Sequence, residues 1–140
     1  MFKVNSFQYG KLDLNGSVSF GYTSLANDIG SHNIALGYGA LTANTTGASN
    51  VALGNNTLAS NLGGLDNVGL GIRASENSTG ANRTVAIGTY SLQNNITGSY
   101  NVGVGYQSGL NITSDYNVII GNAAGTTITT GDKNTIVGAG

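Results

Sequence analysis

Few residues of this 140-residue chain have the chemistry that catalysis or metal binding requires. His32 is the only histidine and cysteine is absent, so one chain cannot assemble a histidine metal cluster, a thiolate site or a His-centred triad. The six acidic residues fall at different positions of the repeat described below and form no evident pair for glycoside hydrolysis. They are Asp13, Asp28, Asp66, Glu76, Asp115 and Asp132. We therefore expect neither an enzyme nor a metal or cofactor site.

The tyrosines are better candidates for contact with a ligand. Tyr22, Tyr38 and Tyr106 share one position of the repeat, and Tyr100 and Tyr116 share another. Aromatic rings along a rod can stack on sugar rings, and they can equally cover the edge of a core or a subunit seam. The structural role is favoured over ligand binding, because aromatic side chains are enriched at interfaces. Tyr22, Tyr38 and Tyr106 remain the candidate receptor-binding residues.

The composition excludes several classes of partner. The net charge is −1 and only 8% of the residues are charged, so no basic field attracts nucleic acid or anionic lipid. No apolar run approaches the roughly 20 residues of a membrane-spanning helix, so we expect no membrane insertion. A hydrophobic fraction of 39% with so few charges is also unlike a disordered segment.

A five-residue pattern that ends in glycine recurs through the chain. Residues 50–54, which read NVALG, are a clear copy. The closing glycines are Gly21, Gly37, Gly54, Gly71, Gly88, Gly105, Gly121 and Gly138. A period this regular predicts a repeat architecture.

The residue types within one repeat predict strands. We number the Asn as position 1 and the Gly as position 5. Bulky residues at positions 2 and 4 alternate with period two, which predicts a short strand whose positions 2 and 4 face the core of the coil. The glycine at position 5 indicates a corner with positive φ or a close backbone approach. Position 9 (Leu25, Leu41, Leu58, Leu92) and position 13 (Ile29, Leu62, Ile96) would supply a second, facing strand.

This pattern predicts an all-β protein, a β-solenoid with about 17 residues per coil. At about 4.8 Å per coil, the seven steps between repeat starts give a rod on the order of 34 Å long. From Asn101 onward Gly109 and Gly125 occupy position 9, and Ile112 and Ile128 appear at position 12. We expect the cross-section of the coil to change there.

Two further columns of the repeat make predictions. Position 3 is small and mostly apolar, with Ala52 typical and Ile119 and Ile136 at the end. If positions 2 and 4 face the core, position 3 faces outward, and its composition predicts burial against other copies in a closed cyclic assembly. The Asn at position 1 recurs once per coil, which predicts a structural ladder of stacked amides.

The chain divides into two parts. Residues 1–16 lie outside the repeat, and their loose apolar alternation predicts one or two short strands acting as an N-terminal cap or as a junction to a neighbouring domain. Residues 17–140 are the expected β-roll repeat domain, with eight repeat starts and an incomplete last coil.

Residues 33–41, 44–47, 117–125 and 128–138 read NIALGYGAL, NTTG, NVIIGNAAG and ITTGDKNTIVG. They resemble the fibre repeats of bacteriophage tail proteins and the left-handed β-roll repeats of trimeric autotransporter adhesin heads. The resemblance covers residues 17–140 and implies a left-handed parallel β-roll and an intertwined or side-by-side homotrimer with position 3 near the three-fold axis.

The phage resemblance implies a virion tail fibre that attaches to a host cell-surface receptor such as a glycan. It also implies a C-terminal intramolecular chaperone that is cleaved off, so that this chain is either a fragment of a longer fibre or a product whose downstream part is missing. The alternative is the head of a bacterial trimeric surface adhesin. The chain departs from that family in lacking a signal peptide, a heptad stalk and a membrane barrel, and its coil is somewhat longer. A polysaccharide-degrading tailspike fragment is the third hypothesis.

Overall fold

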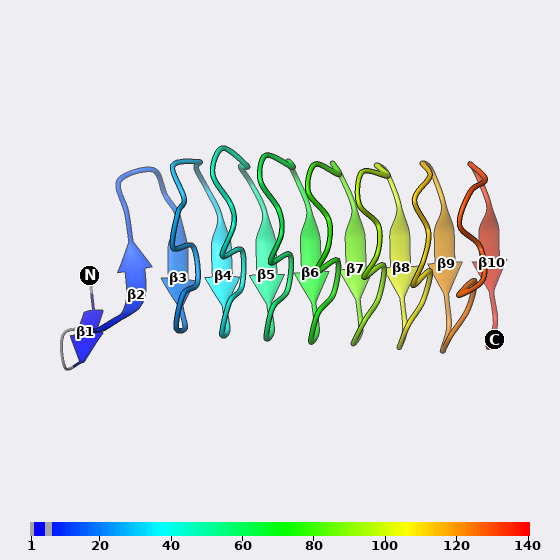
Figure 1. Cartoon of the computed structure of the whole chain (residues 1–140), viewed down its shortest axis with the longest axis horizontal. Helices are drawn as coiled ribbons and strands as arrows, with labels where there is room; N and C mark the ends of the chain where they lie inside the picture. The colour runs from blue at the N-terminus through cyan, green and yellow to red at the C-terminus, as the bar shows by residue number, and fades with distance from the viewer. Residues whose placement is uncertain (1, 5–6) are drawn as a thin grey trace.

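The computed structural model describes residues 2–4 and 7–140, with side chains from residue 10 onward. Ten strands lie side by side in one sheet, in chain order, and form an elongated rod (Figure 1). The strands are β1 (Phe2–Val4), β2 (Phe7–Leu12), β3 (Val18–Phe20), β4 (Ile34–Leu36), β5 (Val51–Leu53), β6 (Val68–Leu70), β7 (Val85–Ile87), β8 (Val102–Val104), β9 (Val118–Ile120) and β10 (Thr135–Val137). The described residues contain no helix, which confirms the all-β prediction.

Strands β3 to β10 are parallel, and each pairs with the next at the same repeat position. Ala35 pairs with Ala52, for example, and the register stays unshifted through β10. One strand per coil and a step of 16 or 17 residues make this part of the chain a β-solenoid. The predicted repeat and its coil length are therefore confirmed.

The residues before the repeat form two strands, at the upper limit of the one or two predicted. β2 pairs antiparallel with β3, so the first parallel strand has a hydrogen-bonded neighbour on its outer side. Gly10 pairs with Phe20, and a Cβ at Gly10 would lie 2.9 Å from the Phe20 ring. Glycine leaves the space that this ring occupies. The role of residues 1–16 as a cap or a junction stays a prediction.

The strand faces are the reverse of the prediction. Ala52 at position 3 is fully buried inside its own coil, whereas Val51 and Leu53 at positions 2 and 4 are only half-buried and point outward. The same holds along the rod, and Ile119 is also fully buried. Period-two alternation shows that positions 2 and 4 share a face but does not show which face is inside. The interior holds one large side chain per coil, and in most coils the leucine at position 9 fills it, so the small column lies inside opposite that leucine.

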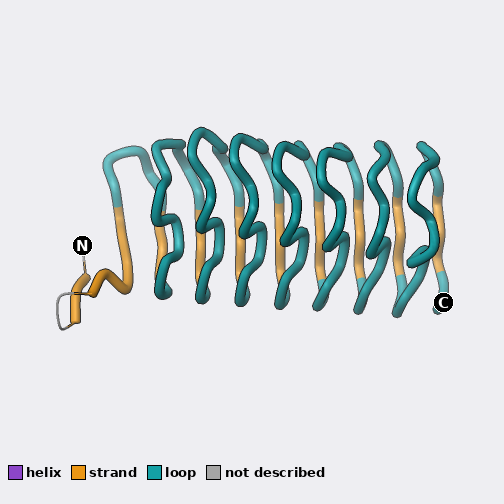
Figure 2. The backbone as a smooth tube through the Cα atoms, in the orientation of Figure 1, coloured by secondary structure: helices purple, strands orange, loops and turns teal. Residues whose placement is uncertain are grey.

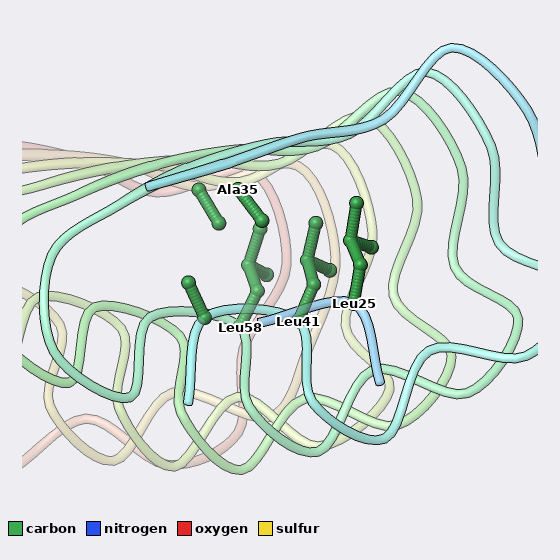
Figure 3. Close-up of a cluster of buried hydrophobic side chains, with 6 residues drawn as sticks. Leu25, Ala35, Leu41 and Leu58 are labelled. Carbon is green, nitrogen blue, oxygen red and sulfur yellow. The ribbon is translucent and has the colours of Figure 1, made fainter. Parts of the chain in front are cut away.

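The layer that faces the sheet consists of turns, and the predicted second strand is absent from the described residues (Figure 2). Leu25, Leu41 and Leu58 point from this layer toward the strand that carries Ala35 (Figure 3). These leucines have φ between 47° and 51°. Left-handed residues at positions 7, 9 and 17 of each coil prevent an extended strand. Position 9 is thus core as expected, but Ile29, Leu62 and Ile96 at position 13 are exposed.

Side-chain size is complementary across the narrow interior. A Cβ at Gly69 would lie 3.3 Å from Leu58, and one at Gly103 only 2.6 Å from Leu92. Near the C-terminal end the arrangement is reversed, with the large side chain on the strand and the glycine in the turn layer. A Cβ at Gly109 would lie 2.8 Å from Ile119. Leucine at position 9 therefore faces a small residue at position 3 of the next coil, and glycine there faces isoleucine. This exchange is the predicted change of cross-section, and it occurs without a shift of strand register.

The Asn residues at position 1 form the predicted ladder. The backbone N–H of Asn50 donates to Oδ1 of Asn33 at 3.0 Å, and that of Asn67 donates to Oδ1 of Asn50 at 3.0 Å. The Nδ2 groups of Asn33, Asn50, Asn67 and Asn101 also donate to carbonyls across their own coils, as from Asn50 to Gly64 at 2.8 Å. These amides are fully or almost fully buried, so the ladder satisfies polar groups that water cannot reach.

A second interior amide column was missed. Nδ2 of Asn44 donates to Asp28 at 2.8 Å, and Nδ2 of Asn61 donates to Oδ1 of Asn44 at 2.7 Å. Ser78 and then Ile112 occupy the same position 12 in later coils. Oδ1 of Asn61 is left without a hydrogen-bond partner in the described part of the chain. The recurrence of Asn at position 12 is visible in the sequence and was the available signal.

The glycine at position 5 has the backbone role expected of it. Gly37 has φ of 137°, and a Cβ there would overlap the carbonyl of Gly54 in the next coil. Both the dihedral angle and the close approach of successive coils require glycine at this corner.

The position-1 ladder predicts opposite effects for two substitutions. Thr84 interrupts the ladder. Its hydroxyl lies 3.5 Å from the Gly98 carbonyl, and within the described residues the backbone N–H of Asn101 has no side-chain acceptor in the preceding coil. Thr84→Asn should add these bonds and raise the free energy of unfolding by about 1 kcal/mol. Asn50→Thr should lower it by about 2 kcal/mol. Urea unfolding at one protein concentration measures both, and shifts of the same sign would contradict the ladder's role.

The size exchange predicts strong coupling between Gly109 and Ile119. Gly109→Leu alone should destabilise by about 1–3 kcal/mol through overpacking, and Ile119→Ala alone by about 2–5 kcal/mol through a cavity. The double variant recreates the leucine-over-alanine pair of the N-terminal coils. It should be more stable than Ile119→Ala, which thermal or urea unfolding of all four proteins would measure. Additive losses would show that the two positions do not share one space.

Candidate functional site

The outward side of the sheet is an apolar strip that runs the length of the solenoid. We call it the sheet face and define it as the first and last residues of strands β3 to β10. Of these residues only Thr135 is polar. Ile34 and Leu36 are exposed by 40% and 39%, and Phe20 by 55%. The alternation at positions 2 and 4 predicts these residues in the core, whereas the structure places them on an outward apolar surface.

The opposite, turn side of the coil is mainly polar. Nδ2 of Asn77 donates to Asn94 at 2.8 Å, and Nδ2 of Asn94 donates to Asn111 at 2.9 Å. Glu76 accepts a hydrogen bond from Gln93 at 2.7 Å. The rod is therefore amphipathic across its thickness, with a sheet face that is apolar except at Thr135 and a turn side that is mainly polar apart from the exposed Ile29, Leu62 and Ile96 at position 13.

The edge at the start of the strands carries charged and aromatic residues at position 17. Arg83 lies 3.6 Å from Asp66, one coil earlier in the same column, and it donates to the Tyr100 hydroxyl at 2.7 Å. The rings of Tyr100 and Tyr116 stack with centroids 4.7 Å apart and planes 4° apart. His32 shares this column and is exposed. The ion pair is exposed on both sides, so it contributes at most about 1 kcal/mol.

The opposite edge, at the end of the strands, carries the predicted receptor-binding tyrosines. Tyr22 and Tyr38 stack with ring centroids 5.8 Å apart. Tyr106 lies four coils beyond Tyr38, and its ring meets that of Tyr90 edge-on at 6.0 Å. The structure thus brings two of the three candidates together and leaves the third separate. Tyr90 was not predicted, because it occupies position 7 rather than position 6 of its coil.

The described residues provide little for acid–base or metal chemistry. They contain no group of three or more His, Asp or Glu side chains that could hold a metal ion. The Lys11 ammonium, 2.7 Å from Asp13, lowers the pKa of that carboxyl below its usual value, and backbone N–H groups of Ser17 and Asn15 add to this. Asp13 is thus a structural group in a turn. A hollow of about 240 Å³ beside Tyr22 is lined by Thr23, Ser24 and Ala26.

No helix in the described ranges is long and apolar enough to cross a membrane. Comparison with protein-family models, curated proteins and solved structures finds no match to this chain. What the protein does must therefore be inferred from its own surfaces, chiefly the sheet face and the tyrosine edge.

Proposed function

We propose that this chain is a structural and adhesive segment of a phage tail fibre that works as a homotrimer. In this arrangement the sheet faces of three copies pack around a common axis, and the coils are left-handed, as in the families that the repeat resembles. The stiff rod holds a host-receptor-binding region away from the virion, and three copies add avidity.

The sheet face is the observation that carries this proposal. Seven steps of about 4.8 Å and three residues of about 3.3 Å give a strip on the order of 300 Å² that is almost wholly apolar. The largest apolar patch on a protein surface is often functional, and this one is continuous along one whole side of the rod, which favours burial against another copy. When the sheet face is buried between copies, the mainly polar turn side of each rod remains in contact with solvent.

In the proposed trimer a different strand face lies toward the three-fold axis than the sequence predicts. Position 3 cannot lie against a neighbouring copy, because Ala52 and Ile119 are buried inside their own coils. Positions 2 and 4 take that role in the proposed trimer. The number of copies in the proposal comes from the resemblance. A dimer in which two sheet faces pack against each other would bury the same strip.

The solution mass distinguishes these assemblies. Light scattering on a size-exclusion column should give one species of about 42 kDa, three times the 14.1 kDa chain. A clean species at 14.1 kDa would refute the buried sheet face, and one at twice that mass would refute the trimer.

Two charge insertions in the same coil test the interface itself. Leu36→Asp places a carboxylate on the sheet face, and Thr46→Asp places one at an exposed turn residue of that coil. Burying three unpaired carboxylates near the axis costs several kcal/mol, so Leu36→Asp should dissociate the assembly. Thr46→Asp should leave the mass unchanged. Equal masses for the two variants would show that the sheet face is not the contact.

A further inference from the structure

A tyrosine is followed by an asparagine one coil later at two places on the strand-end edge. Both residues occupy position 6, directly after the corner glycine. The backbone N–H of Asn56 donates to the Tyr38 carbonyl at 2.8 Å, which places Asn55 in the coil next to Tyr38. The N–H of Ala123 donates to Tyr106 at 2.7 Å in the same way. Tyr38/Asn55 and Tyr106/Asn122 therefore repeat one arrangement.

The polar and aromatic parts of both pairs are accessible. Tyr38 and Tyr106 are 55% and 48% exposed, and Asn55 and Asn122 are exposed as well. The side-chain amides of Asn55 and Asn122 make no hydrogen bond within residues 2–4 and 7–140. Each pair thus offers an aromatic ring beside an amide that retains its donor and acceptor.

The preceding coil supports each tyrosine ring with a second aromatic ring. Tyr22 stacks on Tyr38 at 5.8 Å, and Tyr90 meets Tyr106 edge-on at 6.0 Å. Such contacts hold the ring in place before a ligand arrives, which reduces the entropy lost on binding.

The tyrosines of the other edge are exposed to a similar degree, 40% for Tyr100 and 50% for Tyr116, but no free amide of the described chain lies beside them and their rings pair with each other. Tyr100 and Tyr116 cover each other at 4.7 Å, and the Arg83 guanidinium lies 5.5 Å from the Tyr100 ring centroid. These two rings are occupied by their neighbours, so we assign them a structural role. The two tyrosine columns therefore differ in whether an amide without a partner in the described chain lies beside the ring.

We propose that each Tyr/Asn pair is a subsite for a neutral sugar ring. The C–H face of the sugar stacks on the phenol ring, and the amide accepts from one hydroxyl and donates to its neighbour. A neutral ligand is favoured because position 6 carries no charged residue in any coil, and the nearby Arg73 is paired with Glu76 at 3.6 Å. The inference rests on the proposed fibre function and specifies its receptor chemistry.

The spacing of the two subsites favours a chain of sugars over a single one. Tyr38 and Tyr106 are four coils apart, about 19 Å along the rod at about 4.8 Å per coil. A neutral glycan of several units lying along the edge reaches both subsites. Each subsite is weak alone, and engagement of both, in several copies of the chain, raises the overall affinity.

The test uses the intact chain and a panel of hexasaccharides, with gluco-, galacto-, manno- and N-acetylglucosamine probes as the neutral arm and sialylated probes as the anionic arm. Saturation-transfer NMR measures binding, and light scattering measures the mass of the same samples. The wild-type protein should bind at least one neutral hexasaccharide. Tyr38→Ala/Tyr106→Ala should weaken that binding about tenfold or more at unchanged mass.

Two further variants make the result specific. Asn55→Ala/Asn122→Ala removes amides without a partner in the described chain, so it should weaken binding and leave the mass unchanged. Tyr100→Ala/Tyr116→Ala, the matched control on the opposite edge, should leave binding within about twofold.

Three results would overturn the inference. They are the absence of binding to every neutral probe, binding to sialylated probes alone, and dissociation of the assembly by Tyr38→Ala/Tyr106→Ala. The last result would identify the tyrosines as part of a seam between copies. A trimer without sugar binding contradicts the subsites alone, whereas a monomer that binds sugar contradicts the proposed fibre.

Discussion

The interior of each coil is one side chain thick, and the remaining features of the rod depend on this constraint. A single strand faces a single layer of turns, so a leucine from one layer leaves room only for alanine or glycine in the other. Where Ile119 enters from the strand, Gly109 makes space in the turn. The bulky residues at positions 2 and 4 cannot fit inside and must point outward, which creates the sheet face. An interior so thin buries little apolar surface per residue, which is the physical reason for proposing that the sheet face is buried between copies.

Hydrogen bonds between coils complement this thin core. Buried amides such as Asn33, Asn50 and Asn67 accept from the next backbone N–H and donate across the coil, so each coil completes the polar groups of its neighbour. An amide fits this place because it has both a donor and an acceptor, whereas a threonine hydroxyl is too short to span the coil. The strict period follows, since a residue that breaks the column leaves buried groups in two coils unsatisfied.

The same geometry separates the surfaces on which the proposed function depends. The sheet face is almost wholly apolar, the turn side is mainly polar, and the two strand edges carry different sets of tyrosines. Tyr100 and Tyr116 stack on each other, and Arg83 lies over the Tyr100 ring. Tyr38 and Tyr106 instead lie beside amides that are accessible to a ligand. A rod with these surfaces can associate through one side and present the others, which is the division of roles that a fibre requires.

The period, the strand at positions 2 to 4, the corner glycine and the position-1 ladder follow from the sequence alone, because each depends on residues that recur at one interval. The sequence could not determine which strand face lies inside. Alternation is symmetric between the two faces, and Ala52 is selected for the interior only by what packs opposite it. Nor could it show that the facing layer consists of turns or that Tyr106 meets Tyr90. Those outcomes depend on left-handed residues within each coil and on the stacking of coils, which only the tertiary structure decides.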